Sequence, residues 1–179
     1  DADTWAGAHS LETALRAAGG ACLAVDLVMQ DKAPTAFSAM RPPGHHAEPD
    51  RAMGFCLFSS AAIAARHAQT VWGIDRVAVV DFDVHHGNGT QAAFWDDASL
   101  IYASSHQMPL YPGTGAANEQ GAHNNIFNLP CAPGTSGTEI IKGWRDSLLS
   151  AIVDAAPDLV IISAGFDAHI DDPLGGLAM

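Results

Sequence analysis

Basic side chains are scarce in this chain. Its 179 residues contain eight lysines and arginines against twenty aspartates and glutamates, which gives a formal net charge of −12. Binding to the phosphates of nucleic acids depends on lysine and arginine, so this balance argues against direct nucleic-acid binding. An acidic surface is compatible with a cationic substrate, although such surfaces commonly serve solubility alone.

Cysteines and long apolar runs are also few. The three cysteines (Cys22, Cys56 and Cys131) share no short spacing, so we expect free thiols in a reducing compartment rather than a disulfide framework. No apolar run approaches the roughly 18 residues that a membrane-spanning helix needs. No signal peptide is visible, but the chain opens at Asp1 without a methionine, so a removed leader stays an open alternative. We expect a cytoplasmic protein without membrane contact.

The chain does have the composition of a globular protein, since 48% of its residues are hydrophobic and its length suits one domain. Helical spacing and apolar runs indicate where its elements lie. We expect helices over residues 10–29, with Ser10 as the cap, and over 59–71, 91–95 and 138–155. We expect strands over 35–40, 76–81, 100–104, 126–129 and 159–163. Such alternation is typical of an α/β domain with a parallel sheet.

Polar, histidine-bearing clusters follow four of these strands, at residues 45–46, 81–86, 104–106 and 167–169. Ligands of parallel α/β sheets bind beyond the carboxyl ends of the strands, so the clusters predict one site at that edge. If residues 77–85 are extended, Asp81, Asp83 and His85 project to one side. The alternative is a strand end capped by polar turn residues. We disfavour it because a buried row of this kind is costly unless it is paired or binds a metal.

Two carboxylates and one imidazole form the candidate metal-binding set. Asp83 and His85 follow one strand and Asp167 follows another. Three protein ligands leave a coordination position open for water or substrate, which is the pattern of a catalytic site. Zinc suits this mixed oxygen and nitrogen set, while Fe(II) and Mn(II) stay open.

The tandem His45 and His46 stand on a loop stiffened by prolines, which suits general acid–base work beside a metal. Each imidazole needs a partner that orients it, and Asp81 and Asn88 are the candidates. The alternative for the pair, taken by itself, is an ordinary surface loop.

Two aromatic residues, Phe55 and Tyr111, are flanked by glycine and proline in loops that follow other strands. They could wall a channel for an aliphatic chain, and packing in the core is the alternative. We expect Cys56 to pack rather than act as a nucleophile, and His86 to be structural.

Four motifs together resemble the histone deacetylase family. They are Arg41-Pro-Pro-Gly-His-His-Ala47, Asp81-Phe-Asp-Val-His-His-Gly-Asn-Gly89, Tyr111-Pro-Gly-Thr-Gly115 and Ala164-Gly-Phe-Asp-Ala-His169. The chain looks most like the bacterial, class II-like histone deacetylase-like amidohydrolases and the acetylpolyamine amidohydrolases. The resemblance implies the three-layer arginase/deacetylase α/β fold, with a central, mostly parallel sheet, and hydrolysis of N-acetyl amides.

The resemblance also implies roles for single residues. The zinc ligands fall on Asp83, His85 and Asp167, and the catalytic histidines on His45 and His46, with His46 as general base. Their orienting partners fall on Asp81 and Asn88, and the substrate-binding positions on Gly54, Phe55 and Tyr111. A structural potassium ion would be held by Asp81 and Ser104 with the backbone carbonyls of Asp83, His85 and Ser105. Asp1 or Asp3 would match a rim aspartate that grips the substrate backbone.

Family catalytic domains are longer, so the resemblance implies that residues 1–179 are a single, partial catalytic domain, truncated at both ends. The tyrosine or histidine that binds the oxyanion would lie beyond Met179, and loss of such a donor costs about 10²–10³ in rate. Three hypotheses follow. The chain is a zinc-dependent deacetylase in which metal-activated water attacks the carbonyl of acetyl-lysine or an acetylated polyamine, or a metal-binding fragment without turnover. The third, a binuclear manganese ureohydrolase, needs more carboxylates near Asp83 than the sequence has.

Overall fold

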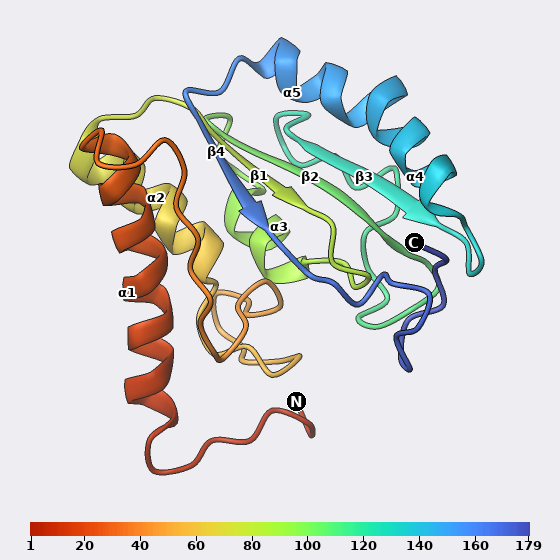
Figure 1. The fold of residues 1–179 in the computed structure, drawn as a ribbon, viewed down its shortest axis with the longest axis horizontal. Helices are drawn as coiled ribbons and strands as arrows, with labels where there is room; N and C mark the ends of the chain where they lie inside the picture. The colour runs from red at the N-terminus through yellow and green to blue at the C-terminus, as the bar shows by residue number, and fades with distance from the viewer.

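A four-stranded parallel sheet forms the centre of the computed structural model, which describes residues 1–179 (Figure 1). Its strands lie in the order β3-β2-β1-β4, and every neighbouring pair is parallel. They are β1 (Val77–Asp81), β2 (Leu100–Gln107), β3 (Ile126–Cys131) and β4 (Leu159–Ser163). The predicted α/β class with a parallel sheet is confirmed.

Helices cover both faces of the sheet. Because side chains alternate along a strand, Val77 and Val79 of β1 point to one face and Ala78 to the other. The first face packs against α1 (Ser10–Met29), α2 (Ser60–Trp72) and α3 (Asn88–Phe94). The second packs against a continuous helical segment made of α4 (Gly137–Gly143), the π-helical turn η1 (Trp144–Leu148) and α5 (Leu149–Ala155). In Figure 1 the two groups of helices lie on opposite sides of the strands.

Most predicted elements form within a few residues of their expected bounds. The helix over residues 10–29 is confirmed, but Ser10 is not its cap. The cap position is His9, and the Ser10 hydroxyl instead accepts the backbone N–H of Gly7 at 2.8 Å. The cap of α4 is complete, since Ser136 and Glu139 exchange the two hydrogen bonds of a capping box.

The strand expected over residues 35–40 does not form, because these residues have no ladder partner. β4 pairs only with β1, so its other edge is open, and Val160 and Ile162 on it are exposed. An apolar run with high strand propensity becomes a strand only where a second backbone supplies its hydrogen bonds. Residues 35–40 have no such neighbour, whereas β4 has one in β1 on one edge only.

The strand β1 ends at Asp81, as expected, but the chain beyond it is not extended, so the side-by-side row of Asp81, Asp83 and His85 on one strand face is wrong. Two carboxylates turn the chain. The side chain of Asp81 accepts the backbone N–H of Asp83 at 3.2 Å, and that of Asp83 accepts the N–H of His85 at 2.8 Å. Such local bonds replace the ladder with successive turns.

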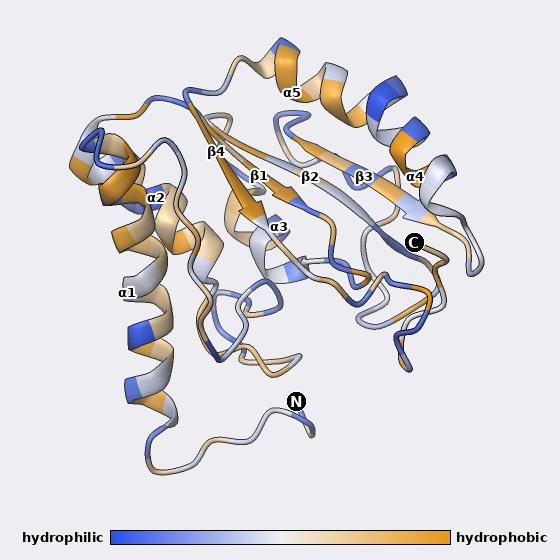
Figure 2. Cartoon of the chain, viewed as in Figure 1, coloured by the Kyte–Doolittle hydropathy of each residue, from blue (hydrophilic) through white to orange (hydrophobic).

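The sheet thereby changes from apolar to polar along its length. Figure 2 shows hydrophobic strands that lead into hydrophilic segments where the strands end. No helix in the structure has both the length and the hydropathy to span a membrane.

Candidate metal centre

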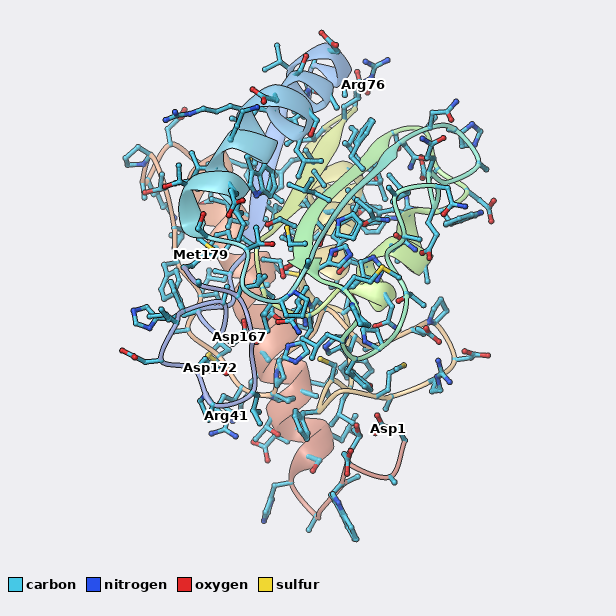
Figure 3. The ribbon with its side chains drawn as sticks, turned by 90° about the vertical axis from the view of Figure 1, so that its right-hand side faces the viewer. Asp1, Arg41, Arg76, Asp167, Asp172 and Met179 are labelled. Atoms are coloured by element: carbon cyan, nitrogen blue, oxygen red, sulfur yellow. The ribbon has the colours of Figure 1, made fainter.

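The candidate site lies where β1 and β4 end. Asp81, the last residue of β1, pairs in register with Ser163, the last residue of β4. The loops that follow the two strands therefore leave the sheet side by side, which brings Asp83 and His85 to Asp167. Figure 3 shows Asp167 in the same half of the molecule as Asp1 and Arg41, while Arg76, just before β1, lies at the opposite end.

The three predicted metal ligands are brought together. One potential ligand atom from each of Asp83, His85 and Asp167 lies within 4.8 Å of the other two. The Nδ1 atom of His85 lies 3.0 Å from Oδ1 of Asp83 and 3.0 Å from Oδ2 of Asp167. All three side chains keep between 19% and 26% of their surface exposed, so a dissolved ion can reach them.

The electrostatics of this triad suit a cation. Burial by itself would lower the pKa of His85, but hydrogen bonds to Asp167 and Asp83 outweigh it and raise the pKa to about 9. A proton on His85 is therefore held between two carboxylates, at the place where a divalent ion would be bound by all three groups. Two carboxylate oxygens and one imidazole nitrogen fit zinc, and they fit Fe(II) or Mn(II) as well.

The backbone leaves room for Asp83 through a glycine. A Cβ atom built on Gly165 would lie 2.2 Å from Oδ2 of Asp83, which is closer than real Cβ contacts come. The loop after β4 can pass the Asp83 carboxylate only because residue 165 has no side chain.

Asp81, one of the two orienting partners expected from the sequence, is paired with His45. Nδ1 of His45 lies 3.0 Å from Oδ2 of Asp81, and both side chains are buried. Burial opposes a charge on His45, but the charge of Asp81 and its hydrogen bond outweigh this and raise the pKa of His45. Asp81 also accepts a hydrogen bond from the hydroxyl of Tyr102 at 3.2 Å.

Asn88, the other expected orienting partner, is paired with His46. Nδ1 of His46 lies 2.9 Å from Oδ1 of Asn88. Burial, followed by repulsion from His45, lowers the pKa of His46 to about 4. The two adjacent imidazoles, whose ring centroids are 4.0 Å apart, thus differ in charge preference because one has a carboxylate partner and the other an amide.

The predicted substrate-binding residues lie around this pair. Gly54 (φ +56) packs against the ring of His46, where a Cβ would lie 2.3 Å from Cδ2, and Phe55 follows with a φ of 65°. The Tyr111 ring stands edge-on to His46 with 5.1 Å between centroids. Phe55 is 63% exposed and Tyr111 40%, so the alternative that they pack in the core is wrong. Asp1 joins them, because its Oδ2 accepts from the Tyr111 hydroxyl at 2.9 Å and from the Gly54 N–H at 3.2 Å.

The two side chains expected to hold potassium, those of Asp81 and Ser104, are neighbours in the sheet. Asp81 on β1 and Ser104 on β2 are register partners, and both are fully buried. The Ser104 hydroxyl lies 2.9 Å from Nδ1 of His106. The side chain of Ser105 accepts a hydrogen bond from Nε1 of Trp144 at 2.9 Å.

Two nearby residues were not expected from the sequence. Tyr102 is a lone phenol in an otherwise apolar part of β2, and a buried hydroxyl of this kind signals a polar partner. Glu48 directly follows the histidine loop, and it accepts a hydrogen bond from the Asn88 side chain at 2.6 Å. Cys56 and His86 are buried, and His86 bonds Thr114 and Gln91, in keeping with their expected structural roles.

Comparisons with known proteins show the family to which this fold belongs. A family profile, the histone deacetylase domain, matches residues 1–179. An uncharacterized protein of Synechocystis sp. is 43% identical over 174 residues, covering 97% of this chain and 57% of that protein.

Two solved structures are also similar. The HD domain of HDA15 has a TM-score of 0.94 at 41% identity and covers 99% of this chain and 54% of its own. Acetylpolyamine aminohydrolase from Burkholderia pseudomallei has a TM-score of 0.90 at 38% identity, covering 96% and 51%. The chain spans about half the length of the relatives it matches.

Proposed function

The chain belongs to the histone deacetylase family and has the arginase/deacetylase fold, and from this premise we propose that it supplies the zinc centre and the proton-transfer histidines of an N-acetyl amide hydrolase. One observation carries the proposal. The donors of Asp83, His85 and Asp167 converge within 4.8 Å, and the ring of His46 lies edge-on to that of His85 at 5.9 Å. Residues 1–179 form one partial catalytic domain in this proposal.

Asp83, His85 and Asp167 would hold the zinc ion. When bound there, zinc would supply Lewis-acid chemistry that polarises an acyl carbonyl and activates water. His85 would have to give up its proton to the solvent for this, because its Nδ1 atom, which lies between the two carboxylates, would serve as the ligand.

The two histidines divide the proton transfers. His46 is neutral near pH 7 because burial lowers its pKa to about 4, so one ring nitrogen is free to accept a proton as general base. Asp81 raises the pKa of His45, which therefore keeps a proton more readily and suits the acid role towards the leaving amine. Asp81 and Asn88 orient the two rings.

The substrate would be an acetylated lysine or an acetylated polyamine. Phe55 and Tyr111 line the approach to His46 and can flank an aliphatic chain, while the Gly54 carbonyl can accept an amide hydrogen. The formal net charge of −12 favours a cationic substrate. The fold shared with the acetylpolyamine aminohydrolase of Burkholderia pseudomallei supports the second class.

A structural potassium ion beside Asp81 and Ser104 belongs to the proposal, with carbonyls of Asp83, His85 and Ser105 as its further ligands. The support is the register of the two buried side chains across β1 and β2. We also propose a cytoplasmic location, which the three free cysteines support.

A paired measurement tests the function: metal content by mass spectrometry, and turnover of a fluorogenic acetyl-lysine peptide and of an acetylated polyamine. One zinc per chain with turnover is the expected result. One zinc without turnover would support a metal-binding chain that does not complete the reaction. Two manganese ions would support a ureohydrolase instead, and a chain that binds no divalent ion would overturn the proposal.

A further inference from the structure

A hydrogen-bond chain, buried at its inner end and half-buried at its outer end, extends from His46 to a residue outside the predicted site. Nδ1 of His46 lies 2.9 Å from Oδ1 of Asn88, and Nδ2 of Asn88 donates to Oε1 of Glu48 at 2.6 Å. Asn88 is 5% exposed, and its Nδ2 also contacts Sδ of Met53 at 3.3 Å. Both polar atoms of the Asn88 amide thus have partners. Rotating the amide would change its hydrogen bonds to His46 and to Glu48 together.

The chemistry of these groups allows one arrangement of protons. An ionised carboxylate only accepts hydrogen bonds, so Asn88 must turn its NH₂ group to Glu48 and its oxygen to His46. An amide oxygen also only accepts, so Nδ1 of His46 must carry the proton. The lone pair then lies on Nε2, the nitrogen that a general base would use. We propose that Glu48 is a positioning residue that sets the tautomer of His46 through Asn88.

Glu48 is anchored for this task. Its other carboxylate oxygen, Oε2, accepts from Nη2 of Arg51 at 2.9 Å. The backbones of the two residues exchange hydrogen bonds of 3.0 and 3.4 Å, which form a small antiparallel bridge. The backbone of Glu48 is thus fixed by the bridge, and its carboxylate has Arg51 as a second partner besides Asn88.

The neighbouring histidine reaches the same tautomer by a shorter route. Asp81 accepts directly from Nδ1 of His45. For His46 the negative charge is moved one residue further away, behind a neutral amide. The carboxylate of Glu48 thus orients the His46 ring through Asn88 without lying next to it. This agrees with the opposite directions in which the pKa values of His45 and His46 are shifted.

The assignment rests on the proposed function only where it calls His46 a base, so the test reads the tautomer itself. Long-range ¹H–¹⁵N correlation spectra of the ¹⁵N-labelled chain near pH 7 report which ring nitrogen carries the proton. His46→Gln identifies the signals. We expect His46 to be a single Nδ1–H tautomer in the unmodified chain. Glu48→Met, which removes the acceptor at similar size, should raise the Nε2–H population roughly tenfold or more, as expected for the loss of a charge-assisted hydrogen bond.

A matched control and a conservative variant complete the design. Glu12 also has an arginine partner at 2.9 Å, but it lies exposed on α1, so Glu12→Met should leave the His46 signals unchanged. Glu48→Gln keeps an acceptor without the charge, so it should retain the Nδ1–H tautomer while the Asn88 NH₂ resonances move. This variant decides the matter if Glu48→Met does not fold.

The outcomes separate the two hypotheses. An unchanged tautomer in folded Glu48→Met, unchanged Asn88 resonances in Glu48→Gln, or an Nε2–H tautomer in the unmodified chain would overturn the role of Glu48. Where turnover is measurable, Glu48→Met should lower kcat with little change in KM. A chain with the expected tautomers but no turnover would count against the proposed function and leave the role of Glu48 standing.

Discussion

Gly165→Ala is the sharpest probe of the metal centre, because it moves one ligand without touching it chemically. The added Cβ would lie 2.2 Å from Oδ2 of Asp83 and 2.5 Å from its Cγ. Real Cβ contacts essentially never fall below 3.0 Å, so the carboxylate must retreat by at least about 0.8 Å. Asp83 is a short side chain already held by the N–H of His85 at 2.8 Å, so it has few other positions. Gly165 has no positive φ, so alanine adds no backbone strain.

The displacement is large on the scale that matters for a metal. Metal–ligand distances in working sites are kept within about 0.2 Å, so a shift of about 0.8 Å removes Asp83 as a ligand. Disturbing only a group that orients a ligand typically costs 10–100-fold in metal affinity, and loss of the ligand should exceed that. We therefore expect zinc affinity to fall at least about 100-fold, which corresponds to about 2.7 kcal/mol.

Competition with a chromogenic chelator would measure the zinc affinity, and thermal unfolding of the metal-free chain would report on the fold. Gly19→Ala is the control, because a Cβ at Gly19 meets nothing within 4 Å and the residue lies inside α1. It should leave zinc affinity unchanged and stabilise the helix by about 1 kcal/mol. Zinc affinity of folded Gly165→Ala within about threefold of the unmodified chain would show that Asp83 is not a ligand.

Three further predictions follow from the same structure. Asp167→Ala removes a carboxylate of the triad and the acceptor of the Val84 N–H at 2.9 Å, so the chain should lose zinc on gel filtration. If zinc is retained at the affinity of the unmodified chain, the proposed ligand set is wrong. Zinc binding should weaken as pH falls from about 8 to about 6, because His85 has a pKa of about 9 and zinc must displace its proton. Calorimetric titrations would measure the zinc affinity across this range, and a constant affinity would contradict the prediction. Leu148→Ala should lower the free energy of unfolding by about 2–5 kcal/mol in urea denaturation, since Leu148 is 3% exposed in the core between the sheet and η1. A loss well below this range would mean that the surrounding core residues close the cavity left by the missing side chain.

The positions of the secondary-structure elements could be predicted from short-range patterns. Trp144, Leu148 and Ile152 recur four residues apart, which predicted the helix over residues 138–155 and the face that it buries. Leu159–Ser163 forms a strand as the apolar run predicts. Both patterns depend only on residues close in the sequence. The helix or strand therefore forms in any fold that supplies a packing surface or a pairing strand. The run over residues 35–40 shows the limit, because strand formation needs a second backbone and the sequence does not say whether one is in place.

The composition of the candidate site could also be predicted, since parallel strands bring their following loops to one edge. Its geometry could not. The extended row from Asp81 to His85 is replaced by turns in which carboxylates accept hydrogen bonds from backbone N–H groups. These turns begin where the pairing between β1 and β4 ends.

Sequence alone therefore determined which residue types gather at the end of the sheet. Only the tertiary structure decided that Gly165 makes room for Asp83, that Tyr102 supports Asp81, and that Glu48 stands behind Asn88. The physical reason is range. Periodicity and turn chemistry act over a few residues, whereas these contacts join residues 21 to 82 positions apart, and strand register and loop packing place them.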